Sequence, residues 1–96
     1  MKERLYLIDL YSYYGDLLTD KQKEYFEDYY YNNLSLAEIS ENNGVSRSAV
    51  GKAIKEIETK LEYYESVLKL YSKVKKLKVK ISDKKMLDEI LEVLEF

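Results

Sequence analysis

The chain has 96 residues, 46% of them hydrophobic, and a formal net charge of −2. It contains no cysteine and no histidine, which excludes disulfides, zinc fingers, thiol nucleophiles and imidazole bases. Because proline is absent and only three glycines occur, we predict an all-α fold, and the length fits a single helical domain over residues 1–96. The sequence has no apolar run long enough to cross a bilayer and no signal-peptide pattern, so we expect a cytoplasmic protein without membrane insertion.

An N-terminal helix is predicted over residues 1–16. Apolar side chains recur there at steps of four, three and four residues, which places them along one side of a helix: Leu7, Tyr11, Tyr14 and Leu18. Thr19 and Gln22 then form a capping box, in which two side chains satisfy each other's free backbone amides at the start of a second helix. Asn32 and Asn33 indicate the end of that second helix.

The most informative segment is LSLAEISENNGVSRSAVGKAIK, which we predict to be the centre of a helix-turn-helix over residues 19–60. Ser35 and Glu38 form a second capping box. Gly44 supplies the corner, because glycine enters the left-handed region without a Cβ penalty, and Ser46 caps the following helix. The two helices are expected to meet in a small core: Ile39, Val45, Val50 and Ile54.

The second helix of this unit, the recognition helix, leaves a basic outward side: Arg47, Ser48, Gly51, Lys52 and Lys55. In helix-turn-helix proteins the first turn of this helix meets base edges and later lysines meet phosphates, so we predict nucleic-acid contacts for Arg47, Ser48, Lys52 and Lys55. The alternative is that these are ordinary solvated side chains on an exposed helix. Gly51 costs about 1 kcal/mol relative to alanine inside a helix. It either admits a nucleic-acid backbone or leaves a base-reading position empty.

The recognition helix has no stop signal after Ser46, and we expect it to run from residue 47 to about residue 72. Apolar positions alternate at steps of three and four along its second half and form a seam: Ile57, Leu61, Tyr64, Leu68 and Tyr71. At 1.5 Å per residue such a helix is roughly 39 Å long, more than a small domain covers by itself. The seam is covered either by the N-terminal helix alone or in a symmetric homodimer, and we favour the homodimer.

A lysine-rich stretch follows the seam. Residues 69–85 hold eight lysines and one acid, Asp83. Residues 75–81 alternate lysine with apolar side chains and are either an extended connector or a continuation of the helix. Five lysines form a second basic surface suited to RNA, unless they only keep the segment solvated: Lys73, Lys75, Lys76, Lys78 and Lys80. Ser82 or Asp83 is expected to cap a C-terminal helix. One side of that helix is apolar: Met86, Leu87, Ile90, Leu91 and Leu94.

The acidic front of the chain argues against tight DNA binding by one copy. Residues 1–45 carry four basic against nine acidic side chains, a net −5, whereas residues 46–60 carry four against two, a net +2. Phosphate contacts dominate affinity for nucleic acid and need several cations on one face. We therefore expect binding that is weak or assisted by a partner.

The segment GVSRSAVGKAI resembles the recognition half of phage-repressor helix-turn-helices, and LTDKQKEYFEDYYYNNLSLAEIS is similar to region four of bacterial sigma factors. From residue 5 to about residue 73 the chain resembles the YlxM family of small bacterial helix-turn-helix proteins, and YGDLLTDKQKEYFEDYY carries the most specific part of the likeness. Members of that family are typically encoded beside the GTPase of the signal recognition particle. The resemblance implies a sigma region 4-like fold and a role in, or in regulating, the signal recognition particle pathway.

Three functions follow from these observations. We expect a non-enzymatic regulatory or accessory protein, without a cofactor, that contacts signal recognition particle RNA or the GTPase. It uses either the helix-turn-helix or the lysine-rich surface. The second hypothesis is a sequence-specific DNA-binding regulator, which reads a major groove as a dimer with Arg47, Ser48 and Lys52. The third is a protein-interaction module that keeps the helix-turn-helix only as a scaffold. Salt dependence separates them, because counterion release weakens nucleic-acid binding steeply.

Overall fold

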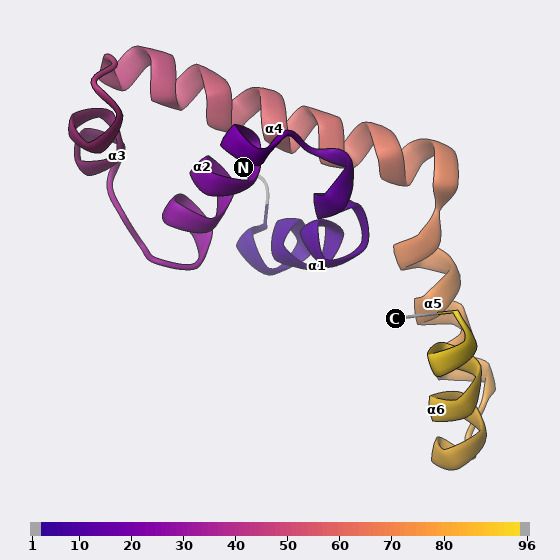
Figure 1. The fold of residues 1–96 in the computed structure, drawn as a ribbon. Helices are drawn as coiled ribbons and strands as arrows, with labels where there is room; N and C mark the ends of the chain where they lie inside the picture. The colour runs from indigo at the N-terminus through magenta and orange to yellow at the C-terminus, as the bar shows by residue number, and fades with distance from the viewer. Residues whose placement is uncertain (1–2, 95–96) are drawn as a thin grey trace.

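Figure 1 shows the computed structural model, which describes residues 3–94. Within that range the chain forms six α-helices and one short 3₁₀ helix, without a strand. They are α1 (Arg4–Tyr14), η1 (Gly15–Leu17), α2 (Asp20–Tyr30), α3 (Leu36–Asn43), α4 (Arg47–Leu68), α5 (Leu70–Lys80) and α6 (Lys84–Val93). The predicted all-α fold with a helix-turn-helix is confirmed, and α3 and α4 are the two helices on either side of the turn.

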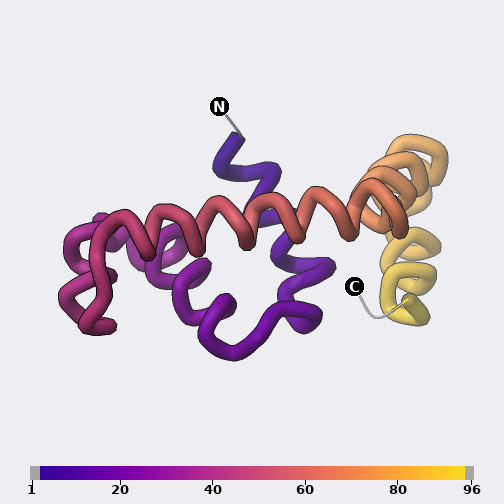
Figure 2. The backbone as a smooth tube through the Cα atoms, turned by 90° about the horizontal axis from the view of Figure 1, so that it is seen from above, coloured from indigo at the N-terminus to yellow at the C-terminus, as the bar shows by residue number. Residues whose placement is uncertain are grey.

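Helix α4 is the central helix of the molecule. It has 22 residues, and α1, α2 and α3 all pack against it, with α3 at its beginning and α1 farther along (Figure 1). Seen from above, α1 crosses α4 steeply, while α5 and α6 stand at the far end of α4 (Figure 2). The molecule is elongated, with principal extents of 49 × 23 × 23 Å. None of the helices described in residues 3–94 has both the length and the apolar character needed to span a membrane.

The core lies between α4 and the three helices that precede it. The side chains that are at most 1% exposed are Leu7, Leu10, Tyr14, Phe26, Ile39, Val50, Ile57 and Leu61. Phe26 stacks on both Tyr11 and Tyr30, at ring-centroid distances of 4.2 and 4.4 Å. Burying an apolar side chain of this size contributes about 1.5–3 kcal/mol, so α1 and α2 stabilise α4 chiefly by covering it. The predicted stripe on the first helix faces this core, and Leu10, which that stripe omitted, is fully buried as well.

Side-chain caps begin the helices at the predicted positions. The Thr19 hydroxyl accepts the Gln22 amide at 3.2 Å, and the Gln22 side chain accepts the Thr19 amide at 3.0 Å. Ser35 and Glu38 make the same reciprocal pair at 3.1 and 3.0 Å. Asp83 caps α6 by accepting a backbone amide at 3.1 Å. Each such cap stabilises its helix by about 1 kcal/mol, so these helix starts are set locally.

Arg4, at the start of α1, caps the end of α2. Its Nη2 donates to the backbone carbonyls of Tyr29, at 3.3 Å, and Tyr30, and to Oδ1 of Asn33 at 2.7 Å. The guanidinium also lies over the Tyr30 ring, 5.1 Å from its centroid. A cation is favoured at a helix C-terminus, so this contact ties α1 to α2. The first helix, predicted over residues 1–16, is divided into α1 and η1, and its first two positions lie outside the described residues.

The prediction of one helix from residue 47 to about residue 72 is wrong at its end. Helix α4 ends at Leu68, and Lys69 lies in the left-handed region at φ 57° and ψ 28°, with α5 beginning directly after it. A lysine in that conformation carries about 1–2 kcal/mol of strain, so contacts elsewhere must hold it there. Residues 75–81 were predicted as either a connector or a helix. They are helical as far as Lys80, and Ile81 is extended.

The carboxylate of Glu65 supplies those contacts. The residue is only 7% exposed, and its oxygens accept the Tyr14 hydroxyl at 2.6 Å and the Tyr71 amide at 3.1 Å. They also accept the amide and the hydroxyl of Ser72 at 3.2 and 2.7 Å. The Tyr14 oxygen in turn accepts the amide of Leu70 at 3.0 Å. One side chain of α4 thereby caps the first turn of α5, whose amides lack helical partners, and links it to α1.

Both acidic groups of this junction have shifted pKa values. Burial raises the pKa of Glu65, but the hydrogen bonds from Tyr14, Ser72 and the backbone amides of Tyr71 and Ser72 lower it more, so the net pKa lies below its ordinary value. Burial, and then the hydrogen bond donated to Glu65, raise the pKa of Tyr14 to about 12. At neutral pH the carboxylate is therefore charged and the phenol remains a donor.

The seam, predicted to be covered either by the N-terminal helix or in a homodimer, is largely covered within the chain. Ile57 and Leu61 are 0% exposed, while Tyr64 and Tyr71 are half-buried. Leu68 is 42% exposed. Ile57 and Leu61 therefore belong to the core of a single chain and not to a contact between two copies.

Glu65→Gln is expected to lower the free energy of unfolding by about 1–3 kcal/mol at neutral pH, because its amide nitrogen leaves donors of α5 without an acceptor. Urea unfolding followed by far-UV circular dichroism measures the loss. Glu56→Gln, on the exposed side of α4, is the matched control and is expected to change stability by less than about 0.5 kcal/mol. Equal losses in the two variants would contradict the role given to Glu65.

The same carboxylate predicts a pH dependence of stability. Folding lowers the pKa of Glu65, so its contribution is complete above the ordinary glutamate pKa of about 4.3 and is lost as the pH falls through the lower value of the folded protein. The difference in unfolding free energy between the unmodified chain and Glu65→Gln is expected to be largest near neutral pH and to shrink in acid. A difference that stays constant in acid would show that the charge of Glu65 is not what stabilises the junction.

Candidate nucleic-acid interface

The corner between α3 and α4 has the geometry that a helix-turn-helix requires. Gly44 lies in the left-handed region at φ 65° and ψ 34°, and no atom lies within 4 Å of the position that a Cβ would occupy. The amides of Gly44 and Val45 both donate to the carbonyl of Ser40, that of Val45 at 3.1 Å. The corner therefore needs glycine for its backbone conformation and not for space. The prediction that Val45 joins the core is wrong, because the turn carries it past the end of α3 and leaves it 41% exposed.

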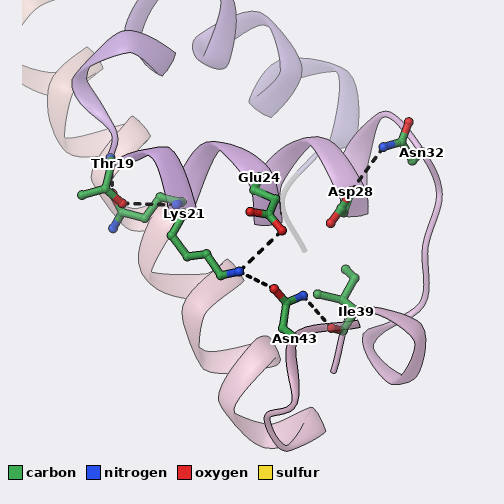
Figure 3. A network of polar contacts seen from close by, with 8 residues as sticks. Thr19, Lys21, Glu24, Asp28, Asn32, Ile39 and Asn43 are labelled. Atoms are coloured by element: carbon green, nitrogen blue, oxygen red, sulfur yellow. Dashed lines mark hydrogen bonds and ion pairs between the residues drawn. The ribbon is translucent and has the colours of Figure 1, made fainter. Parts of the chain in front are cut away.

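A polar tie holds the end of α3 against α2 (Figure 3). The side chain of Asn43 donates to the Ile39 carbonyl at 2.7 Å, one turn back in α3, and accepts a hydrogen bond from the Lys21 ammonium of α2. Lys21 also lies 3.5 Å from a carboxylate oxygen of Glu24. These bonds fix the last turn of α3, from which the corner starts.

The first turn of α4 is capped and exposed. The Ser46 hydroxyl accepts the Ala49 amide at 3.1 Å, and the side chains of Arg47 and Ser48 that follow are exposed. Free backbone amides and the helix dipole make such a helix start favourable for negatively charged groups. The residues predicted to read bases therefore lie at the end of α4 that attracts phosphate.

The buried positions of α4 determine which side of the helix is free. The buried apolar side consists of Val50, Ile54, Ile57 and Leu61. The opposite side carries exposed side chains at steps of four, three and four residues, hereafter the α4 outer stripe: Ser48, Lys52, Lys55 and Thr59. A shallow groove along this side is lined by Lys52, Lys55, Glu56, Thr59 and Lys60. The structure thus brings the predicted contacts Ser48, Lys52 and Lys55 together on one exposed side, with Arg47 in the turn that precedes them.

Gly51 lies between the buried and the exposed sides of α4. A Cβ at this position would lie 3.6 Å from Cδ1 of Leu36, an ordinary packing distance. Gly51 is therefore half-buried beside α3, which differs from the outward position predicted for it. The spacing of 100° per residue that places Lys52 outward turns the preceding residue toward the neighbouring helix.

Exposed carboxylates on α3 limit where a polyanion can bind. Glu38 and Glu41 are both exposed, and hydrogen bonds from the backbone amide and side chain of Ser35 lower the pKa of Glu38. The negative charge of α3 repels phosphate and favours its approach to the α4 outer stripe. Within residues 3–94 the carboxylates do not gather in any group of three that could hold a metal ion.

The second predicted basic surface lies on α5, at the end of α4 that is far from the corner (Figure 1). Five lysines are exposed there: Lys73, Lys75, Lys76, Lys78 and Lys80. Among the described residues none of the five makes an ion pair. Lys75 lies over the Tyr71 ring, 5.7 Å from its centroid, and both line a groove with Val79. A ring among lysines can stack on a base while the ammonium groups meet phosphates.

Comparison with known proteins identifies the family. Residues 1–94 match UPF0122, the helix-turn-helix proteins described as YlxM / p13 like. The chain belongs to this family. A UPF0122 protein of Malacoplasma penetrans is 44% identical over 86 residues, which cover 86% of this chain and 80% of that protein. A UPF0122 protein of Caldanaerobacter subterraneus subsp. tengcongensis is 49% identical over 77 residues, which cover 80% of this chain and 66% of the relative. The family resemblance read from the sequence is confirmed.

Replacing the two glycines of the helix-turn-helix with alanine is expected to change the stability of the chain in opposite directions. Gly51→Ala fits beside Leu36 and improves helix propensity, so it is expected to stabilise the chain by up to about 1 kcal/mol. Gly44→Ala forces an L side chain into the left-handed region and is expected to destabilise the chain by about 1–2 kcal/mol. Urea unfolding of the two variants tests both signs. A destabilised Gly51→Ala variant would contradict the packing described between α3 and α4.

Proposed function

We propose that this protein is a non-enzymatic regulator that binds nucleic acid with the α4 outer stripe. One observation carries the proposal: Ser48, Lys52 and Lys55 are exposed together on the side of α4 opposite its buried residues. Membership of a helix-turn-helix family supports the same conclusion. The finer assignment is a DNA-binding regulator whose α4 enters the major groove of a duplex.

In this mode the residues of α4 have separate tasks. Arg47, in the first turn, is placed to donate to the acceptor edge of a base such as guanine. Lys52 and Lys55, one and two turns later, contact phosphates and set the orientation of the helix on the duplex. The exposed helix start adds a favourable dipole for a nearby phosphate.

The number of cations limits the affinity. Arg47, Lys52, Lys55 and Lys60 are exposed on this part of α4, and the carboxylate of Glu56 lines the groove beside the three lysines. If the four contact about four phosphates, counterion release weakens binding on the order of 10²-fold between 50 and 200 mM salt. Since α2 and α3 are acidic, binding by one copy is weak, and a second copy or another partner strengthens it.

A role in the signal recognition particle pathway is the second candidate, and the α5 lysines favour it. The five lysines are exposed and have no ion-pair partner in the described part of the chain, and Lys75, Lys76 and Lys80 line a groove with Tyr71. Such a surface suits RNA, which proteins recognise through phosphates, shape and stacked bases. The likeness to YlxM proteins makes the RNA of the signal recognition particle, or its GTPase, the ligand to test. A pure protein-interaction module is the third candidate and is recognised by binding that changes little with salt.

Arg47→Ala combined with Lys52→Ala is expected to weaken binding to duplex DNA at least about tenfold, because one base contact and one phosphate contact are lost. Fluorescence anisotropy with a labelled random-sequence duplex, repeated from 50 to 200 mM salt, measures both the affinity and its salt slope. Far-UV circular dichroism checks that the doubly substituted chain remains helical. Unchanged duplex affinity would eliminate DNA reading by α4.

Replacing Lys75, Lys76, Lys78 and Lys80 with glutamine tests the α5 surface separately. This variant is expected to lose affinity for signal recognition particle RNA and to keep its duplex affinity, because the α4 outer stripe is intact. The Arg47→Ala and Lys52→Ala variant is the reciprocal control and is expected to keep the RNA contact. RNA affinity that survives the four glutamines would rule out α5 as the RNA surface.

A further inference from the structure

Helix α6 carries an apolar side that the described chain covers only in part, since Leu87, Ile90 and Leu91 are half-buried. None of its residues is buried, and Met86 and Val93 are 53% and 83% exposed. A groove on the outer side of the helix is lined by Met86, Glu89, Ile90, Val93 and Leu94. A helix with an apolar side of this kind is stabilised only when that side packs against another surface.

Apart from the Asp83 cap, the charged residues of α6 are arranged against the helix dipole. Lys84 and Lys85 occupy the first turn, and Asp88, Glu89 and Glu92 follow them. The dipole favours the opposite order, with acids at the start and bases at the end. In the part of the chain that the structure describes, none of these five side chains makes an ion pair. If a second helix of the same sequence lies alongside in the opposite direction, the lysines of each helix lie near the acids of the other.

We propose that two copies of this chain pair through their α6 helices, antiparallel and related by a two-fold axis. Glu89 lines the apolar groove, and Lys85 precedes it by one turn, so the two exposed charges lie along the same edge of α6. A two-fold axis perpendicular to the helices brings this edge of each copy together with the same edge of the other, running in opposite directions. Lys85 of each copy then meets Glu89 of the other, and Met86 and Ile90 pack between the helices.

The charges of α6 also select this occupant over a lipid surface. Asp88, Glu89 and Glu92 repel the anionic headgroups that an amphipathic surface helix usually binds. The charged edge of the groove is complementary to the same edge of a second copy, because Lys85 of each copy lies opposite Glu89 of the other. Pairing through α6 leaves the α4 outer stripe exposed in both copies, and it does not depend on nucleic-acid binding.

Sedimentation equilibrium of the full chain, over a range of concentrations, tests the pairing. We expect a reversible dimer, and we expect Ile90→Asp to be monomeric, since it places a charge at the centre of the apolar groove. Because α6 contributes no buried residue, thermal unfolding of the main helical body is expected to be unchanged in this variant. A chain that stays monomeric at the highest concentration would overturn the proposal, and so would an Ile90→Asp variant that still forms dimers.

Charge reversal tests the antiparallel arrangement and remains informative if Ile90→Asp disturbs α6. Lys85→Glu and Glu89→Lys are each expected to weaken self-association about tenfold or more, because both symmetry-related pairs become like-charged. The chain with both substitutions, and the mixture of the two single variants, are expected to regain it. Lys73→Glu on α5 is the control. Self-association that is equal in all these chains would overturn the arrangement, as would binding of a monomeric chain to phosphatidylcholine vesicles through α6.

Discussion

The burial of one side of α4 is the constraint on which the rest of the structure depends. Three helices from the front of the chain cover Val50, Ile57 and Leu61 completely, so the rotation of α4 about its own axis is fixed. The opposite side is then exposed for the same reason, and it presents Lys52 and Lys55 along one line. The basic face is therefore a consequence of core packing, and no separate interaction is needed to orient it.

Glu65 fixes the position of the C-terminal half relative to α4. Its carboxylate lies near the end of α4 and satisfies amides at the start of α5, while the Tyr14 hydroxyl joins α1 to both helices. These bonds hold Lys69 in a conformation that lysine rarely adopts. The direction of α5, and with it the position of its lysines and of α6, is held by this buried carboxylate and by the packing of Leu70 and Tyr71 against the core. Three surfaces with different chemistry are thereby spread along one elongated molecule.

Much of this could be predicted from the sequence, and the failures have physical causes. The caps at Ser35 and Asp83 were predictable because their partners lie three residues away. The break at Lys69 was not, because it depends on a contact between Glu65 and Tyr14, which are 51 positions apart. The exposure of Lys52 and Lys55 was also predictable, because they are charged and their spacing places them opposite the apolar positions of the helix. That Gly51 faces α3 could be known only from the way the two helices cross.

The central claim, that the side of α4 opposite the core is a nucleic-acid interface, is tested most directly by chemical-shift mapping. Adding a DNA duplex to the isotopically labelled chain is predicted to shift the backbone amides of residues 47–60 most, with α1 and α6 nearly unaffected. Shifts confined to α5, or to the acidic surface of α2 and α3, would contradict the account.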